Sequence, residues 1–418
     1  MRIDYTIWQA TQQHKLQPRW RFAFLAVIAL IASGIPSSSG SAQTVAYTGV
    51  TIESISDDTI ENGTLVIKGD EIVDVGEDVD IPGNARVVSM KGMTIMPGLI
   101  DPYYVYKRSA AATRTVVFGG RTFTLPSRAN FTTGSFTWVG KYFYPYTTDF
   151  RPAMRTGITT ANLVTDGRGL SALSNIEEEA TDETVFEDEG VLFAQVTNQT
   201  TAIDIVRKKL VSDKKKTTTT STRTRTRASS TTDPTKEFWK AVNEGEKPMF
   251  VNVNNAAGVA HLLKAVKEHE KVRLVLVATG PNLFQSLDEI KKNENVTVVL
   301  QPGIDRVPFK SELMNVSRML EEREIPFAIS MSLSGNQMRQ SQDDPMFPLA
   351  MLVRTGVDRQ TALKSVTMKP AELLGIEKEY GSLEKGKKAN FLVFDGDPLE
   401  TGNSLKKVFL NGKLTYEN

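Results

Sequence analysis

The sequence predicts an α/β protein in which a parallel sheet closes into a barrel and the two ends of the chain form a smaller β-domain. Two observations predict the barrel: compact apolar runs of strand length recur through the middle of the chain, and helical patterns separate most of them. Strands that alternate with helices indicate a parallel sheet, and this many repeats favour closure. A third observation, the turn-rich alternating pattern at both ends, predicts the β-domain.

The β-domain is expected to be composite. Residues 44–98 contain short segments such as GTLVIKGDEIVDVG, in which apolar residues alternate and glycine or aspartate marks the turns. Residues 377–418 have the same character. We therefore expect the two ends to fold together and to enclose a barrel domain over residues 99–376.

Within the barrel domain, apolar runs predict strands and amphipathic patterns predict the helices between them. The expected strands cover residues 157–164, 191–196, 248–254, 272–279, 296–302 and 325–332. The expected helices cover residues 256–270, 282–294 and 311–324, with closing helices over 358–376 that are interrupted at Pro370.

Two segments depart from this rhythm. Residues 108–150 are rich in threonine, glycine and aromatic residues, and they predict a β-rich insertion after the first barrel strand. Loops after barrel strands lie at the mouth, so we expect this insertion to cover it. Residues 213–235 are basic and of low complexity, with almost no apolar side chain, and they predict a solvated surface loop.

The start of the chain predicts export. The basic residues 15–21 precede the apolar run 22–32, and small residues follow up to Ala42, which is the order found in secretory signal peptides. Residues 1–42 are therefore expected to be a signal peptide, and the protein to be periplasmic or extracellular. The alternative is an uncleaved anchor, but the apolar run is shorter than the ~20 residues that span a bilayer, so we expect no stable membrane anchor.

The composition of the chain excludes several kinds of partner and of functional site. The net charge of +1 gives no basic field, so nucleic acid is not an expected partner. The sequence has no cysteine, which excludes disulfides, thiolate ligands and a cysteine nucleophile. It has three histidines, His14, His261 and His269, and the first would leave with the signal peptide. Few sites for a catalytic zinc could be built from the remaining two.

Several motifs together resemble the amidohydrolase superfamily, in particular its imidazolonepropionase-like branch. They are MPGLID, RTGITTANLV, DRQTALKSVTMKPAELLGI and GSLEKGKKANFLVFDGDPLE, and the resemblance extends over most of residues 44–418. It implies a distorted (β/α)8 TIM barrel with a β-sandwich built from both ends of the chain. It also implies a lineage of hydrolases of non-peptide C–N bonds, with zinc or another divalent metal at the barrel mouth.

The metal ligands implied by the resemblance are missing from this sequence. The two histidines after the first strand would fall on Tyr103 and Val105, and the histidine after the fifth strand on Asn252. The histidine after the sixth strand would fall at Ala278, and the aspartate after the eighth at Ser332. The ligand after the fourth strand cannot be assigned to a residue, because no strand pattern marks that strand in residues 200–240. We therefore expect neither a metal nor another cofactor.

His261 and His269 do not replace these ligands. They lie eight residues apart on one predicted helix, roughly 12 Å along its axis. Two hypotheses remain. The first is a secreted pseudoenzyme that binds a small molecule, forms a homo-oligomer or pairs with an active relative. The second is an active hydrolase of cyclic amides or dipeptides that uses an atypical, metal-poor site.

Overall fold

The computed structural model describes ten ranges of the chain. They are residues 43–106, 114–118, 121–125, 136–196, 206–207, 209–210, 235–279, 283–306, 310–333 and 344–418. The proposed signal peptide and residues 213–234 of the low-complexity segment lie outside these ranges. Among the described residues, no helix is long and apolar enough to cross a membrane.

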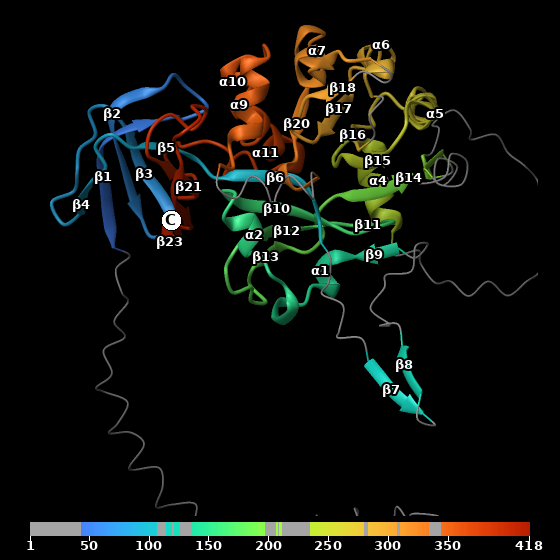
Figure 1. Ribbon diagram of the computed structural model, residues 1–418, viewed down its shortest axis with the longest axis horizontal. Helices are drawn as coiled ribbons and strands as arrows, with labels where there is room; N and C mark the ends of the chain where they lie inside the picture. Colours follow the sequence, from blue (N-terminus) through green and yellow to red (C-terminus); the bar gives the residue numbers. More distant parts are fainter. Residues whose placement is uncertain are drawn as a thin grey trace, which may run out of the picture. The chain divides into compact units, whose positions relative to one another are not determined.

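Strands from both ends of the chain share one eight-stranded sheet, at the blue and red ends of the colour scale (Figure 1). From the first end come β1 (Thr44–Ile52), β2 (Ile60–Lys68), β3 (Glu71–Gly76), β4 (Arg86–Ser89) and β5 (Thr94–Pro97). From the second come β21 (Phe391–Phe394), β22 (Leu405–Leu410) and β23 (Lys413–Glu417). The two sets meet where β21 pairs with β5 in antiparallel register, from Phe391 opposite Pro97 to Phe394 opposite Thr94.

An aromatic cluster packs on one face of this sheet. The rings of Phe391 and Phe409 stack with their centroids 4.3 Å apart, and Tyr47 meets each of them edge-on at 5.6 Å. All three side chains are buried. Aromatic pairs in such geometries each contribute about 0.5–1.5 kcal/mol beyond the area that they bury. The cluster therefore holds the first strand of the chain against two of the last.

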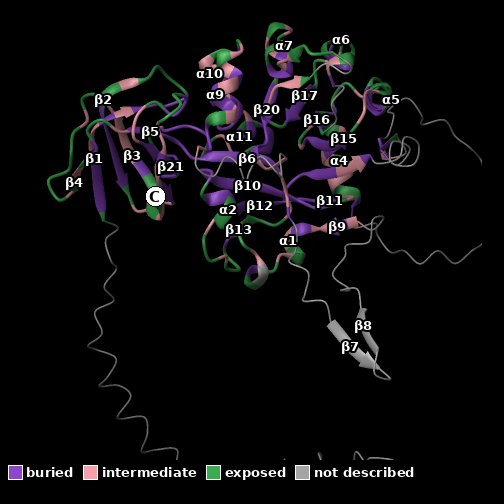
Figure 2. Ribbon diagram, viewed as in Figure 1, coloured by how far each residue is buried: buried purple, intermediate pink, exposed green. Residues whose placement is uncertain are grey.

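The middle of the chain supplies a series of seven strands. Where two of them share a ladder, they pair in parallel. They are β6 (Leu99–Val105), β10 (Ile158–Val164), β14 (Leu192–Val196), β15 (Met249–Val253), β16 (Leu274–Ala278), β17 (Val296–Leu300) and β20 (Phe327–Ile329). These positions confirm the strands expected from the apolar runs. Most of their residues are buried, as the purple strands show (Figure 2).

Backbone ladders between the described residues do not close these strands into a barrel, contrary to the expectation. Among the described residues they fall into a four-stranded sheet, β13-β12-β10-β6, and a seven-stranded sheet, β20-β17-β16-β15-β14-β11-β9. The division lies at Ser171, the single residue between β11 (Arg168–Leu170) and β12 (Ala172–Asn175). Because β11 pairs with β14 while β12 pairs with β10, this stretch passes from one sheet to the other.

Among the described residues, no strand lies between β14 and β15, where the fourth strand would be expected. β14, the third of the parallel strands, pairs directly with β15, from Leu192 opposite Met249 to Val196 opposite Val253. The ladder leaves no room for another strand between them. The sheet therefore continues without the strand that would carry a ligand after the fourth position.

The helices end earlier than predicted, and the helix expected from residue 311 begins only at Val316, after the strand β19 (Leu313–Met314). The bounds are α4 (Lys236–Glu244), α5 (Ala256–Val266), η3 (Leu283–Ser286), α6 (Leu287–Lys291), α7 (Val316–Glu322), α9 (Phe347–Arg354), α10 (Arg359–Ser365) and α11 (Met368–Leu374). The expected break at Pro370 is wrong: the helices separate at Val366 and Thr367. Pro370 lies in the first turn of α11, where a missing N–H costs no helical hydrogen bond.

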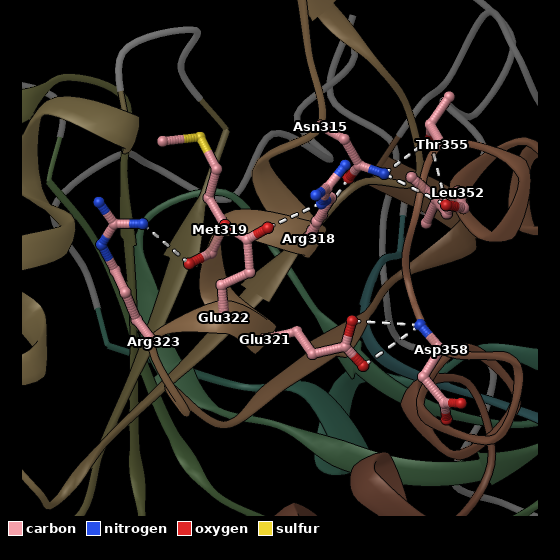
Figure 3. A network of polar contacts seen from close by, with 9 residues as sticks. All are labelled: Asn315, Arg318, Met319, Glu321, Glu322, Arg323, Leu352, Thr355 and Asp358. Atoms are coloured by element: carbon pink, nitrogen blue, oxygen red, sulfur yellow. Dashed lines mark hydrogen bonds and ion pairs between the residues drawn. The ribbon is translucent and has the colours of Figure 1, made fainter.

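A polar network joins α7 to the helices that follow it (Figure 3). The Asn315 side chain caps α7 by accepting from the Arg318 amide, and its Nδ2 donates to the Leu352 carbonyl and the Thr355 hydroxyl. The Glu321 carboxylate accepts from the backbone N–H of Asp358, the residue that caps α10. These bonds fix α7 against the end of α9 and the start of α10.

The insertion predicted over residues 108–150 is only partly β-structure. It contains the hairpin of β7 (Arg114–Phe118) and β8 (Arg121–Leu125), then β9 (Phe136–Trp138), α1 (Val139–Tyr142) and η2 (Pro145–Thr147), before α2 (Arg151–Met154). Tyr106, which follows β6, packs its ring 5.6 Å from that of Phe143 and hydrogen-bonds with Thr148. This part of the insertion therefore lies beside the C-terminal end of β6.

Candidate functional site

A buried carboxylate, Asp101, connects the first and last of the parallel strands. Its Oδ1 accepts from the Tyr103 amide at 3.0 Å and from the Ser330 hydroxyl at 2.7 Å. Its Oδ2 accepts from the Ser332 amide at 2.8 Å. Asp101 is on β6, Ser330 follows β20, and Ser332 lies in η4 (Met331–Leu333). Side chains and backbone amides thus join two strands that share no ladder among the described residues.

Burial governs the electrostatics of Asp101. Removal from water raises the pKa of its carboxyl, and the hydrogen bonds from Ser330, Ser332 and Tyr103 oppose this rise only in part. Both carboxylate oxygens already accept hydrogen bonds. The group is therefore positioned to hold the two strand ends together and has little capacity left to bind an ion.

A second polar cluster lies at the ends of β6, β15 and β16. Tyr103 is buried, and burial raises the pKa of its hydroxyl while a hydrogen bond with Asn252 acts in the opposite direction. The Asn252 Oδ1 accepts from the Thr279 hydroxyl at 2.9 Å. Two positions that the resemblance gives to metal ligands, Tyr103 and Asn252, are thus in contact with each other.

One of the five ligand-equivalent positions, Ala278, lies next to a polar residue of the second cluster. Ala278 is the last residue of β16, but the side chain that reaches Asn252 is that of Thr279. Consecutive side chains of a strand point to opposite faces, so a shift by one residue changes which face a side chain occupies. The signal was in the sequence: Thr279 is the polar residue that ends the apolar run LVLVA.

Of the two remaining positions, one lies in the Asp101 cluster and the other against the hydrophobic core. Ser332 belongs to the Asp101 cluster, where its hydroxyl also donates to the Tyr103 carbonyl at 3.3 Å. Val105 is half-buried and packs against the hydrophobic core. Valine has no donor atom, so this position contributes only packing.

The two histidines of the described residues lie elsewhere. His261 is exposed on α5, whereas His269 lies beyond the end of that helix at Val266. The expectation that one helix carries both is therefore wrong. The chain turns at this point, since the His269 amide donates to the Val266 carbonyl and the His269 carbonyl accepts from Val272.

The donor set at the strand ends does not fit the divalent metal that the resemblance implies. Around Asp101 it offers a phenol, an amide and hydroxyls, all engaged with one another, where zinc requires imidazole, thiolate or free carboxylate. Among the described residues, no group of three or more histidine, cysteine, aspartate or glutamate side chains could hold a metal ion.

A cavity of about 220 Å³ opens beside the second cluster, at the C-terminal ends of β16 and β17. Asp305 contributes its only ionisable side chain among the described residues. The sequence pattern did not mark this residue, because it lies in a strand of only two residues, β18 (Asp305–Arg306). The lining consists of Ala278, Thr279, Leu283, Leu300, Gln301, Gly303, Asp305 and Val316.

Comparison with known proteins agrees with this architecture. Residues 255–415 match the model of the amidohydrolase family. A stretch of 49 residues is 47% identical to an imidazolonepropionase from Alkaliphilus metalliredigens, and this match spans 10% of the chain and 12% of that relative.

Solved structures match over a much larger part of the chain. An amidohydrolase from Thermotoga maritima superimposes with a TM-score of 0.67 at 17% identity, over 90% of this chain and 100% of the other. A prolidase complexed with N-methylphosphonate-L-proline gives a TM-score of 0.54 at 14% identity, over 90% and 100%. At these identities the structural likeness speaks for the fold. The sequence matches show that the chain is similar to the amidohydrolase family over residues 255–415 and, over a short stretch, to an imidazolonepropionase.

Proposed function

We propose that this protein is an exported pseudoenzyme: by lineage a hydrolase of non-peptide C–N bonds, but without hydrolytic activity, and acting through a bound small molecule or a partner subunit. One observation carries the proposal. The strand ends that would hold the metal carry Tyr103, Asn252 and Thr279, and Asn252 is the hydrogen-bond partner of the other two. These side chains supply no ligand set for zinc.

The chemical consequence concerns the attacking water. A bound zinc lowers the pKa of its water from 15.7 to about 7, and without this shift water is a poor nucleophile for an amide. Asp101 is an unsuitable base in its place. It is buried, and both of its oxygens accept hydrogen bonds from Tyr103, Ser330 and Ser332.

Metal content and turnover, measured together, test the proposal. Protein comprising residues 43–418 would be loaded with zinc or manganese, dialysed and analysed for metal, then screened against cyclic amides and dipeptides. An active imidazolonepropionase serves as positive control. We expect substoichiometric metal and no turnover. Stoichiometric metal, or turnover that disappears in Asp101→Asn but persists in Asp182→Asn, would instead establish the atypical hydrolase.

The finer features of the fold are proposed on the same basis. β6 and β20 would be the first and last strands of a distorted (β/α)8 TIM barrel that lacks its fourth strand, with the Asp101 contacts at the point of closure. The eight-stranded sheet would form the accompanying β-sandwich. A crystal structure tests both, and β6 and β20 lying on opposite sides of an open sheet would exclude the barrel.

Export and assembly have separate tests. We expect N-terminal sequencing of exported protein to start near Gln43, as the pattern of residues 15–42 implies. Protein that retains Met1 in the cytoplasm would contradict this. Light scattering of the purified protein, alone and mixed with an active relative, distinguishes a homo-oligomer from a mixed assembly.

A further inference from the structure

The cavity at the ends of β16 and β17 is built on fixed elements. Leu300 ends β17, and Asp305 lies on the short strand β18 (Asp305–Arg306), which pairs with β19 (Leu313–Met314) so that Asp305 is opposite Met314. The far wall comes from Val316, the first residue of α7, whose N-terminus is capped by Asn315. A carboxylate is thus held at the cavity by a hairpin and a capped helix.

Asp305 differs from the other carboxylate of the site in its contacts with the described residues. Asp101 accepts three hydrogen bonds, whereas Asp305 has no hydrogen bond or ion pair with any described residue. Burial raises the pKa of Asp305, and no described residue adds to this shift or opposes it. A half-buried carboxyl without a partner is costly to ionise, and a cation placed beside it would offset that cost.

The rest of the lining restricts what such a cation can be. Among the described residues it contains no lysine or arginine, so Asp305 is not neutralised from within the cavity. Leu283, Leu300 and Val316 supply apolar surface, while Thr279 and Gln301 supply hydroxyl and amide groups. The volume of about 220 Å³ is smaller than the ~300–1,000 Å³ of pockets for drug-sized ligands.

We propose that this cavity binds a small primary amine in its ammonium form, with Asp305 as counter-ion, Thr279 and Gln301 as hydrogen-bonding groups, and a short alkyl body against Leu283, Leu300 and Val316. The inference rests on the proposed function, because it names the class of small molecule that a non-hydrolytic site would bind. A carboxylate ligand would meet the charge of Asp305 and is disfavoured.

Calorimetric titration with n-butylammonium chloride tests the inference on protein comprising residues 43–418. We expect saturable binding to the unmodified protein, and at least a tenfold weaker affinity in Asp305→Asn. Asp182→Asn is the matched control, because it neutralises an exposed aspartate whose side chain has no hydrogen bond or ion pair with a described residue. This variant should bind n-butylammonium as the unmodified protein does. Sodium butyrate, similar in size and opposite in charge, should not bind.

A second variant locates the ligand without altering any charge. A side-chain carbon added at Gly303 meets no atom within 4 Å, so Gly303→Leu can extend into free space at the cavity wall. It should weaken n-butylammonium binding while the thermal unfolding temperature stays unchanged. Equal affinity in Asp305→Asn, equal affinity for butyrate, or no saturable binding at millimolar n-butylammonium would each overturn the inference.

The titration with n-butylammonium and the test of the proposed function can fail independently of each other. If the protein binds metal and hydrolyses an amide, the pseudoenzyme proposal fails, whatever the titration shows. If it does neither and also does not bind the ammonium ion, the pseudoenzyme proposal stands and only the assignment of the cavity is lost.

Discussion

Two junctions of this molecule join segments that are far apart in the sequence, and they do so by different means. At the first, β21 and β5 form a backbone ladder from Phe391 opposite Pro97 to Phe394 opposite Thr94. At the second, β6 and β20 share no ladder among the described residues, and Asp101 connects them by accepting from Ser330 and Ser332. The first junction depends on backbone and apolar packing, the second on the identity of a few polar side chains.

The difference shows that the two junctions depend on different side chains. At the β5–β21 junction the ladder is made by backbone groups, and buried rings such as that of Phe391 supply the packing. The strand ends near Asp101 are where the resemblance would place metal ligands, and there Asp101 accepts hydrogen bonds from Ser330 and Ser332. In this chain, polar groups at these strand ends contribute to structure.

The largest effect is expected from Phe391→Ala, which breaks the packing of the first junction. The ring is fully buried and stacks on Phe409 and against Tyr47, so its removal leaves a cavity in the sheet's core. We expect the free energy of unfolding in urea to fall by about 3–5 kcal/mol. Phe347→Ala, at a ring that is 47% exposed, is the control and should change it by less than about 0.5 kcal/mol. Similar losses in both variants would show that the junction is not a packed core.

The second junction should be weakened by Asp101→Ala. The amides of Tyr103 and Ser332 would lose their acceptor, while the removal of a buried carboxyl relieves some desolvation. We expect a net loss of about 1–3 kcal/mol in the free energy of unfolding. Ser330→Ala removes one donor and leaves both amides paired, so its loss should be smaller. A loss in Ser330→Ala as large as that in Asp101→Ala would mean that the carboxylate is not the centre of the junction.

The sequence predicted the positions of the strands but not their division into two sheets. Strand positions followed from apolar runs and turns, because burial imposes a regular pattern on each strand separately. The division into two sheets at Ser171 did not follow, since it depends on pairing between β11 and β14 and between β12 and β10. Pairing partners are a tertiary property, and no local pattern encodes them.

The candidate site shows the same limit. The positions of Tyr103 and Asn252 could be read from motifs, but their contact with each other, and the role of Thr279 in place of Ala278, required the strand register. Asp305 was missed altogether, because its interest lies in the cavity and in the lack of a partner. Both are properties of the surroundings and not of the residue type.

The pH dependence of stability sharpens the second junction further. The pKa of Asp101 is raised above its ordinary value of 3.8, so the folded protein keeps this proton to higher pH than the unfolded chain does. The contribution of Asp101 to stability is therefore fully present below that value and is lost as pH rises through the folded pKa. We expect the stability advantage of the unmodified protein over Asp101→Asn to shrink as pH rises from 4 to 7, by at most ~1.4 kcal/mol per pH unit. Urea unfolding of both proteins at each pH measures it, and an advantage that grows with pH would contradict a raised pKa.

The smallest effect is expected from Tyr103→Phe, which tests whether the second polar cluster contributes to stability at all. The substitution keeps the buried ring and removes the hydroxyl that bonds with Asn252, while Asn252 retains the hydrogen bond from Thr279. One typical hydrogen bond contributes about 0.5–1.5 kcal/mol, so the free energy of unfolding should fall by about that amount. Tyr104→Phe is the matched control: burial raises the pKa of the neighbouring Tyr104 to about 12, yet no hydrogen bond contributes to that shift. Tyr104→Phe also removes a hydroxyl, but it should leave the free energy of unfolding nearly unchanged.

If both variants lowered the free energy of unfolding by the same amount, the Tyr103–Asn252 contact would contribute no stabilising energy. The polar residues at the strand ends would then be tolerated there without having acquired a structural role.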